Sequence, residues 1–175
     1  MLQRIQTLYI AIAFALTFLL LYVPMADLDM TGLTSAAGTV LAEKYSYTAV
    51  GVKQYFTDPN FNGPTSGYLY HSVALMILVI LILLIDIFII LLFKKRILQM
   101  RVCVFNIMLN VGIYALFFLF VMKTSSEISS SVGVSTPMNY HLSLIFPVIS
   151  CGLTYLAIRA IGKDEALVRS LDRIR

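Results

Sequence analysis

The sequence of 175 residues contains no tryptophan, only two cysteines and two histidines, and few charged residues, which make up 13% of the chain. A soluble domain of this length needs a larger charged surface, so the composition excludes an ordinary water-soluble enzyme or binding domain. Hydrophobic residues instead make up 59% of the chain, which indicates a membrane protein. The net charge of +4 comes from short clusters at the ends of apolar runs rather than from a polar face, which argues against nucleic acid as a partner.

Sequence motifs of common catalytic and metal sites are missing as well. The chain has no CxxC, HExxH or GxSxG motif and no phosphate-binding glycine loop. Cys103 and Cys151 both fall inside apolar runs at different depths, so we expect two free thiols that pack as small side chains rather than a disulfide or a reactive pair. The sequence therefore predicts no cofactor, no metal and no catalytic residue.

The chain is organised around two long apolar runs, Val73 to Phe93 and Val102 to Met122, joined by a short basic linker. About twenty apolar residues in a helix span the roughly 30 Å hydrocarbon core of a bilayer, and the linker allows only a tight reversal. Cations in short loops stay on the cytoplasmic side. The linker, which contains Lys94, Lys95, Arg96 and Arg101, is therefore predicted to lie in the cytoplasm.

The same reasoning predicts one membrane domain over residues 1–175, an all-α protein folded as an antiparallel four-helix transmembrane bundle with both termini in the cytoplasm. The first apolar run is longer than the hydrophobic region of a signal peptide, so we interpret it as a retained helix. Ten of the 13 lysines and arginines then lie inside, and Lys44, Lys53 and Lys123 lie outside. The predicted layout is transmembrane helices 5–25, 71–93, 102–122 and 141–161, outer loops 26–70 and 123–140, a cytoplasmic turn 94–101 and a tail helix 162–175.

The two outer loops differ in composition. In the first, Thr39 to Ala42 and Tyr45 to Phe56 are rich in β-branched and aromatic residues, which is compatible equally with a small β hairpin or meander and with an irregular loop. The segment Lys123 to Asn139 is rich in serine, which predicts a flexible loop.

The tail is predicted to be amphipathic, because apolar residues recur at helical spacing on an otherwise polar segment. It would lie on the cytoplasmic leaflet, with its arginines on anionic headgroups, or dock under the bundle or onto a partner. The predicted surface consists of the apolar residues Leu167, Leu171 and Ile174 and the basic residues Arg169, Arg173 and Arg175.

Asp86 is the least expected residue of the apolar runs. An acid near the centre of a membrane helix costs about 2.5 to 3.5 kcal/mol on insertion, so it normally faces protein or water and has a partner. Helical rise places Asp86, Asn106 and Thr154 in a similar layer. We expect a hydrogen bond between Asp86 and Asn106, Asn110 or both. The predicted polar cluster also includes Arg101 or Arg159 as a counter-charge.

Polar residues in two regions allow a functional interpretation as well as a purely structural one. Asp86 either sets helix register as a polar clasp, which we favour because it is the only intramembrane acid, or titrates during proton or cation transport. His71 and His141 begin two helices near Asp27 and Asp29, which would allow an outer-face metal or enzyme site. The absence of ligand spacing favours ordinary interfacial histidines.

Three sequence segments distributed over the chain resemble those of a known family: Met1 to Tyr9, Phe93 to Arg101 and Arg159 to Arg175. In this order they resemble the Domain of Unknown Function 4293 family, small four-helix membrane proteins of Bacteroidota. The resemblance implies a bacterial inner-membrane location and four helices. It transfers no activity and no site residues.

Among function classes, the sequence favours a non-enzymatic accessory or scaffolding subunit of an envelope complex, in contact with the lipid bilayer and with another membrane or envelope protein. A small transporter or channel component that uses Asp86 is the alternative, and a membrane enzyme with an outer-face site is the weaker one.

Overall fold

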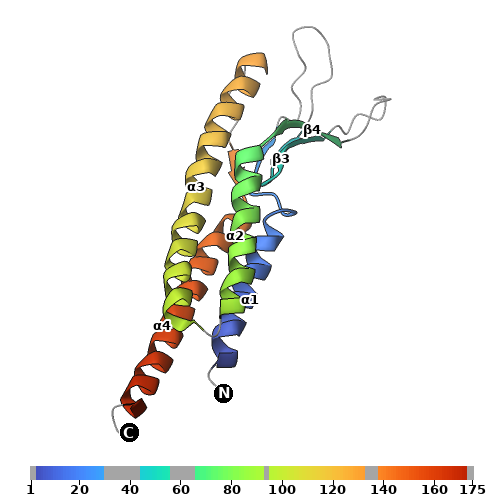
Figure 1. The fold of residues 1–175 in the computed structure, drawn as a ribbon. Helices are drawn as coiled ribbons and strands as arrows, with labels where there is room; N and C mark the ends of the chain where they lie inside the picture. The colour runs from blue at the N-terminus through green and yellow to red at the C-terminus, as the bar shows by residue number, and fades with distance from the viewer. Residues whose placement is uncertain (1–2, 30–43, 56–65, 93–94, 133–137, 173–175) are drawn as a thin grey trace. The chain divides into compact units, whose positions relative to one another are not determined.

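The computed structural model describes residues 3–29, 44–55, 66–92, 95–132 and 138–172 (Figure 1). This part of the chain forms four α-helices and one five-stranded antiparallel sheet. It divides into two compact units. The helical unit comprises Met1–Leu19, Leu78–Ile113 and Ile145–Arg175, and the sheet unit comprises Leu20–Ile77 and Tyr114–Leu144.

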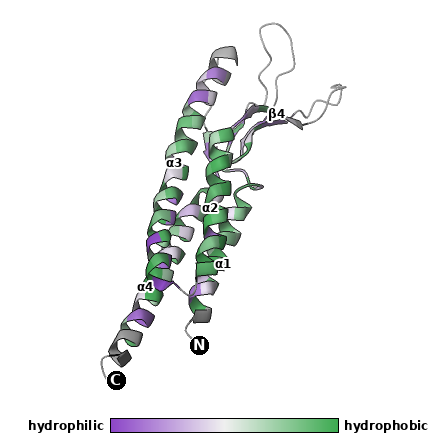
Figure 2. Ribbon diagram, viewed as in Figure 1, coloured by the Kyte–Doolittle hydropathy of each residue, from purple (hydrophilic) through white to green (hydrophobic). Residues whose placement is uncertain are grey.

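Three of the described helices are long and apolar enough to cross a membrane, which indicates a multi-pass membrane protein. The helices are α1 (Gln3–Leu19), α2 (Val73–Leu91), α3 (Arg96–Val132) and α4 (Phe146–Asp172). The apolar sequence of α2 is interrupted only by Asp86, and Figure 2 shows its hydrophobic character. With 17 residues, α1 is about 26 Å long, shorter than a typical span. The fourth crossing therefore stays a prediction.

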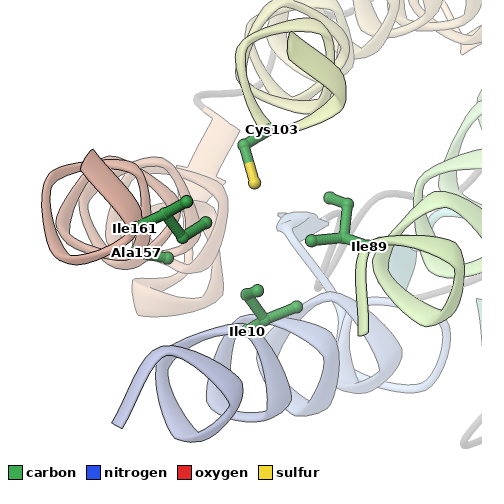
Figure 3. Packing of buried hydrophobic residues seen from close by; sticks show 5 residues of the cluster. All are labelled: Ile10, Ile89, Cys103, Ala157 and Ile161. Atoms are coloured by element: carbon green, nitrogen blue, oxygen red, sulfur yellow. The ribbon is translucent and has the colours of Figure 1, made fainter. Parts of the chain in front are cut away.

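The core of the helical unit receives side chains from all four helices (Figure 3). Ile10 of α1, Ile89 of α2 and Cys103 of α3 point toward Ala157 and Ile161 of α4, and each of the five is at most 1% exposed. Small side chains such as alanine and cysteine allow close helix approach. Both cysteines are free, as the sequence predicts.

The sheet has the order β4-β3-β2-β1-β5, and each pair of neighbours is antiparallel. β5 follows α3, whereas the other four strands precede α2, so the two predicted outer loops contribute to one sheet. The strands are β1 (Ala26–Asp29), β2 (Lys44–Tyr47), β3 (Gly51–Tyr55), β4 (Ser66–His71) and β5 (Met138–Tyr140).

The register separates an apolar row from a polar row, because successive side chains of a strand point to opposite faces. A register shift between β3 and β4 at Val52/Lys53 pairs Tyr70 with Val52 and Tyr68 with Lys53, so the two tyrosines belong to different rows. In strand order, the apolar row is Tyr70, Val52, Tyr47, Ala26 and Tyr140. Tyr47 is fully buried, and its ring packs edge-on against Phe120 of α3, with 6.2 Å between centroids. The apolar face of the sheet therefore packs on the part of α3 that belongs to the sheet unit.

The expectation of an all-α protein is corrected by this sheet. A hairpin is present where Tyr45 to Phe56 is predicted to be β-structured, as β2 and β3, while Thr39 to Ala42 lies outside the described residues. No feature of the sequence predicted β5. A three-residue strand has no recognisable alternation, and its pairing with β1 depends on residues more than one hundred positions away.

The predicted loop 123–140 is also corrected, because α3 continues to Val132. Thr124 Oγ1 donates to the Phe120 carbonyl at 2.8 Å, and Ser126 Oγ donates to the Lys123 carbonyl at 2.7 Å. Serine-rich segments are usually assigned to loops because serine hydroxyls compete with the helix for backbone hydrogen bonds. Here the hydroxyls donate to carbonyl groups of the same helix, so they do not interrupt it. At its other end α3 begins at Arg96, inside the predicted turn 94–101.

The last helix starts later and runs further than predicted. A 3-10 turn, Leu142–Ile145, precedes α4, which then continues past position 162 to Asp172 without a separate tail helix. Residues 173–175, with Arg173, Ile174 and Arg175, lie outside the described residues. Leu167 is 56% exposed.

Candidate functional sites

The first candidate site is a polar clasp between α2 and α3. Asn106 Nδ2 donates to Asp86 Oδ1 at 2.7 Å, and both side chains are fully buried. The bond joins two helices of the helical unit. Buried amide and carboxylate groups in an apolar interior need such partners, because neither can hydrogen-bond to lipid.

The other predicted members of the cluster are not joined to Asp86 by a hydrogen bond or ion pair in the described part of the chain. Asn110 Nδ2 donates to the backbone carbonyl of Asn106 at 3.0 Å, and Thr154 Oγ1 donates to that of Ser150 at 2.8 Å. Both are buried, but each bond lies within one helix. Arg101 and Arg159 are exposed, so the predicted counter-charge is not found.

Several buried oxygen atoms of the helical unit lack hydrogen-bond partners among the described residues: Asp86 Oδ2, Asn106 Oδ1, Asn110 Oδ1 and Ser150 Oγ. Three of them are acceptors only, so water or a cation would satisfy them where another acceptor would not. The described residues contain no group of three or more His, Cys, Asp or Glu side chains that could hold a metal ion.

A second polar contact of the helical unit was missed by sequence reasoning. Gln6 Nε2 of α1 donates to Asp164 Oδ2 of α4 at 2.6 Å, and Arg96 Nη1 of α3 donates to the Asp164 carbonyl at 3.3 Å. Gln6 and Asp164 are both buried. The available signal was helical spacing, because Gln6 lies four residues before buried Ile10 and Asp164 lies three after buried Ile161.

The second candidate site is the polar face of the sheet, which in this article means Asp27, Asp29, Lys44, Ser46, Lys53, Tyr68 and Asn139. One row crosses all five strands, with Tyr68, Lys53, Ser46, Asp27 and Asn139 as partners in strand order. Lys53 Nζ lies 5.1 Å from the centre of the Tyr68 ring, a cation–π contact.

Asp27 is the centre of this face. Its Oδ2 atom lies 2.6 Å from both Lys44 Nζ and His141 Nε2, while its side chain is only 3% exposed. Burial acts to raise the pKa of Asp27, but Lys44, Ser46 and His141 more than offset this effect, so the pKa lies below its ordinary value. The hydrogen bond to Asp27 correspondingly raises the pKa of Lys44.

The two histidines near the predicted outer boundary have different surroundings. His141 contacts Asp27, whereas His71 stacks on Tyr68, with 5.2 Å between ring centroids. Asp29 accepts a hydrogen bond from Asn139 Nδ2 at 3.0 Å. The His and Asp residues therefore take part in separate contacts within the sheet.

Comparison with protein families matches residues 2–174 to the model of the family Domain of unknown function (DUF4293). The chain belongs to the DUF4293 family. No curated protein matches the sequence. The description of the DUF4293 family states no activity, so the function of this member has to be argued from its own residues.

Acid should weaken the sheet of this DUF4293 protein through Asp27. Because its folded-state pKa lies below the ordinary 3.8, the ionised carboxylate stabilises the sheet above about pH 4, and this contribution is lost as the pH falls further. We expect the unfolding temperature in detergent to fall more between pH 6 and pH 3 for the wild type than for Asp27→Asn. Parallel pH dependence of the two proteins would contradict a stabilising role of the charge.

Proposed function

We propose that this protein is a non-enzymatic accessory or scaffolding subunit of a complex in the bacterial inner membrane, and that the polar face of the sheet is its main contact surface. The helices anchor the subunit in the bilayer, with four crossings and both termini in the cytoplasm. The sheet then lies on the extracytoplasmic side.

The pairing of β1 with β5 supports this topology. The two strands come from the segments before α2 and after α3, and paired strands must lie on one side of a membrane. Two crossings, one by α2 and one by α3, return the chain to that side. The excess of cations in the opposite segments supports a cytoplasmic location for them.

The observation that carries the proposal is the ordered sheet itself. A plain membrane anchor needs only short connections, and long connections with their own structure are usually functional. Here the centre of the apolar face is buried at Val52, Tyr47 and Ala26. The opposite face presents two lysines, an acid and a partly exposed tyrosine: Lys44, Lys53, Asp29 and Tyr68. Tyrosine is enriched in protein contact surfaces, and charged side chains at their rim select the partner.

The tail supplies the second proposed contact surface. Its arginines and its apolar stripe would face anionic headgroups or a cytoplasmic partner. Asp164, at the start of the tail segment 162–175, accepts hydrogen bonds from Gln6 of α1 and Arg96 of α3, which supports a fixed position for the start of the tail.

Site-specific photo-crosslinking in native membranes tests the proposal. A photoreactive amino acid at Lys53 should give one stoichiometric cross-linked product, whereas the same group at Met108, which is 68% exposed on α3, should not. The charge reversal Lys53→Glu should reduce co-purification of that partner severalfold in mild detergent. A protein that purifies alone and cross-links at neither position would overturn the proposal.

A second candidate is a small transporter or channel component with Asp86 as its proton or cation site. The unpartnered buried oxygen atoms of Asp86, Asn106 and Asn110 favour it. Ion flux in liposomes that is lost on Asp86→Asn would support this function, and no flux above that of empty liposomes would exclude it.

A further inference from the structure

A surface groove of the helical unit combines an apolar floor with two cationic side chains. It has a volume of about 330 Å³ and lies between α1 and α4. Its lining consists of Ile5 and Tyr9 from α1 and of Leu156, Arg159, Ala160 and Lys163 from α4. The two residues of α1 are four positions apart, as are Arg159 and Lys163, so each wall is one face of its helix.

The groove extends from the level of the two cations toward the interior of the proposed membrane span. The hydrogen bond from Gln6 to Asp164 places the start of α1 level with the residues that follow Lys163. Leu156 lies two turns of α4 before Lys163, deeper in the proposed membrane span. The groove therefore leads from cations near the proposed cytoplasmic surface to apolar side chains in the bilayer.

The two cations lack a compensating charge in the described part of the chain. Arg159 and Lys163 are both exposed, and neither belongs to an ion pair there. The buried carboxylate of Asp164 instead accepts a hydrogen bond from Gln6. Like charges four residues apart repel each other on a helix, and an anion between them would relieve this repulsion.

We propose that this groove binds one anionic glycerophospholipid of the cytoplasmic leaflet. Arg159 and Lys163 bind the phosphate, and one acyl chain lies along Leu156, Ala160 and the ring of Tyr9. A free phosphate ion would use the two cations but leave the four other lining residues without a ligand. The apolar lining therefore favours a lipid over inorganic phosphate.

Retention of lipid by the purified protein tests this site. After incubation with vesicles of equal parts phosphatidylglycerol and phosphatidylethanolamine, native mass spectrometry should show one phosphatidylglycerol bound to the wild type. The variant Arg159→Gln/Lys163→Gln should retain at least fivefold less. Arg101→Gln is the matched control, because Arg101 is exposed but does not line the groove, and it should retain as much as the wild type.

A second variant keeps the test independent of the charge change. Ala160→Phe fills the groove while both cations remain, and it should lower lipid retention to the same extent. Retention equal to that of the wild type in either groove variant, or binding of phosphatidylethanolamine equal to that of phosphatidylglycerol, would overturn the proposal. Displacement of the bound lipid by millimolar inorganic phosphate would assign a bare anion site instead. Partner cross-linking at Lys53 should be unaffected, so this proposal and the scaffold proposal fail separately.

Discussion

Replacing Gly51 by alanine is expected to disrupt the sheet. A Cβ atom at this position would lie 2.2 Å from the carbonyl oxygen of Tyr70 and 3.0 Å from the Cα atom of His71, both backbone atoms of the paired strand β4. β3 cannot easily move away from β4, because the Gly51 carbonyl accepts hydrogen bonds from the backbone N–H and the hydroxyl of Thr48, both at 2.9 Å. Overpacking against backbone should cost about 3 kcal/mol or more.

Gly67→Ala is the matched control for this prediction. Gly67 lies in β4 of the same sheet, and apart from its two chain neighbours no atom of the described residues lies within 4 Å of the added Cβ. The substitution should change the free energy of unfolding by no more than about 0.5 kcal/mol. Thermal unfolding in detergent compares the two variants. Equal stability of Gly51→Ala and Gly67→Ala would contradict the close approach of Gly51 to the backbone of β4.

The second large effect is expected from Asn106→Leu. This change removes the amide group that donates to Asp86 and leaves the buried carboxyl group of Asp86 without that hydrogen bond. The free energy of unfolding should fall by at least about 2 kcal/mol. An ordinary hydrogen bond between membrane helices contributes only about 0.6 kcal/mol. Asp86→Asn keeps an oxygen acceptor for Asn106 and should cost no more than about 1 kcal/mol.

The double variant Asp86→Leu/Asn106→Leu distinguishes the loss of the hydrogen bond between Asp86 and Asn106 from a general disturbance of helix packing. Removing both polar partners should restore most of the stability that Asn106→Leu loses, because no buried polar group of the pair is then left unpaired. Equilibrium unfolding of the wild type, Asp86→Leu, Asn106→Leu and the double variant gives the coupling energy. A double variant no more stable than Asn106→Leu would contradict the pairing of Asp86 with Asn106 as the origin of the effect.

The sequence predicted the helices better than the contacts at their surfaces. Apolar length alone located α2 and the membrane part of α3, and helical rise placed Asp86 level with Asn106. The prediction that Arg101 or Arg159 lies beside Asp86 was wrong, because it used the depth of each arginine in the membrane but not the direction in which its side chain leaves the helix. Arg101 and Arg159 each lie five residues from a buried polar residue, Asn106 and Thr154, and five residues turn a helical side chain about 140° away. Both arginines are accordingly exposed.

The sheet could be predicted only in part for a different reason. Alternation along β2 and β3 is local and can be read from sequence, but the position of β1 between β2 and β5 depends on distant pairing. The contact of Asp27 with Lys44 and His141 depends on that pairing as well. Only a common side of the membrane for the two loops could be predicted, from the distribution of cations.

The most direct test of the account is the side of the membrane on which each segment lies. Single cysteines at Tyr68, Asn139 and Lys95, all exposed, can be introduced after Cys103 and Cys151 are replaced by alanine. An impermeant maleimide added to intact spheroplasts should label positions 68 and 139 but label position 95 only after permeabilisation. Labelling of 68 and 139 from opposite sides, or of 95 together with them in intact spheroplasts, would contradict the proposed topology and the shared sheet.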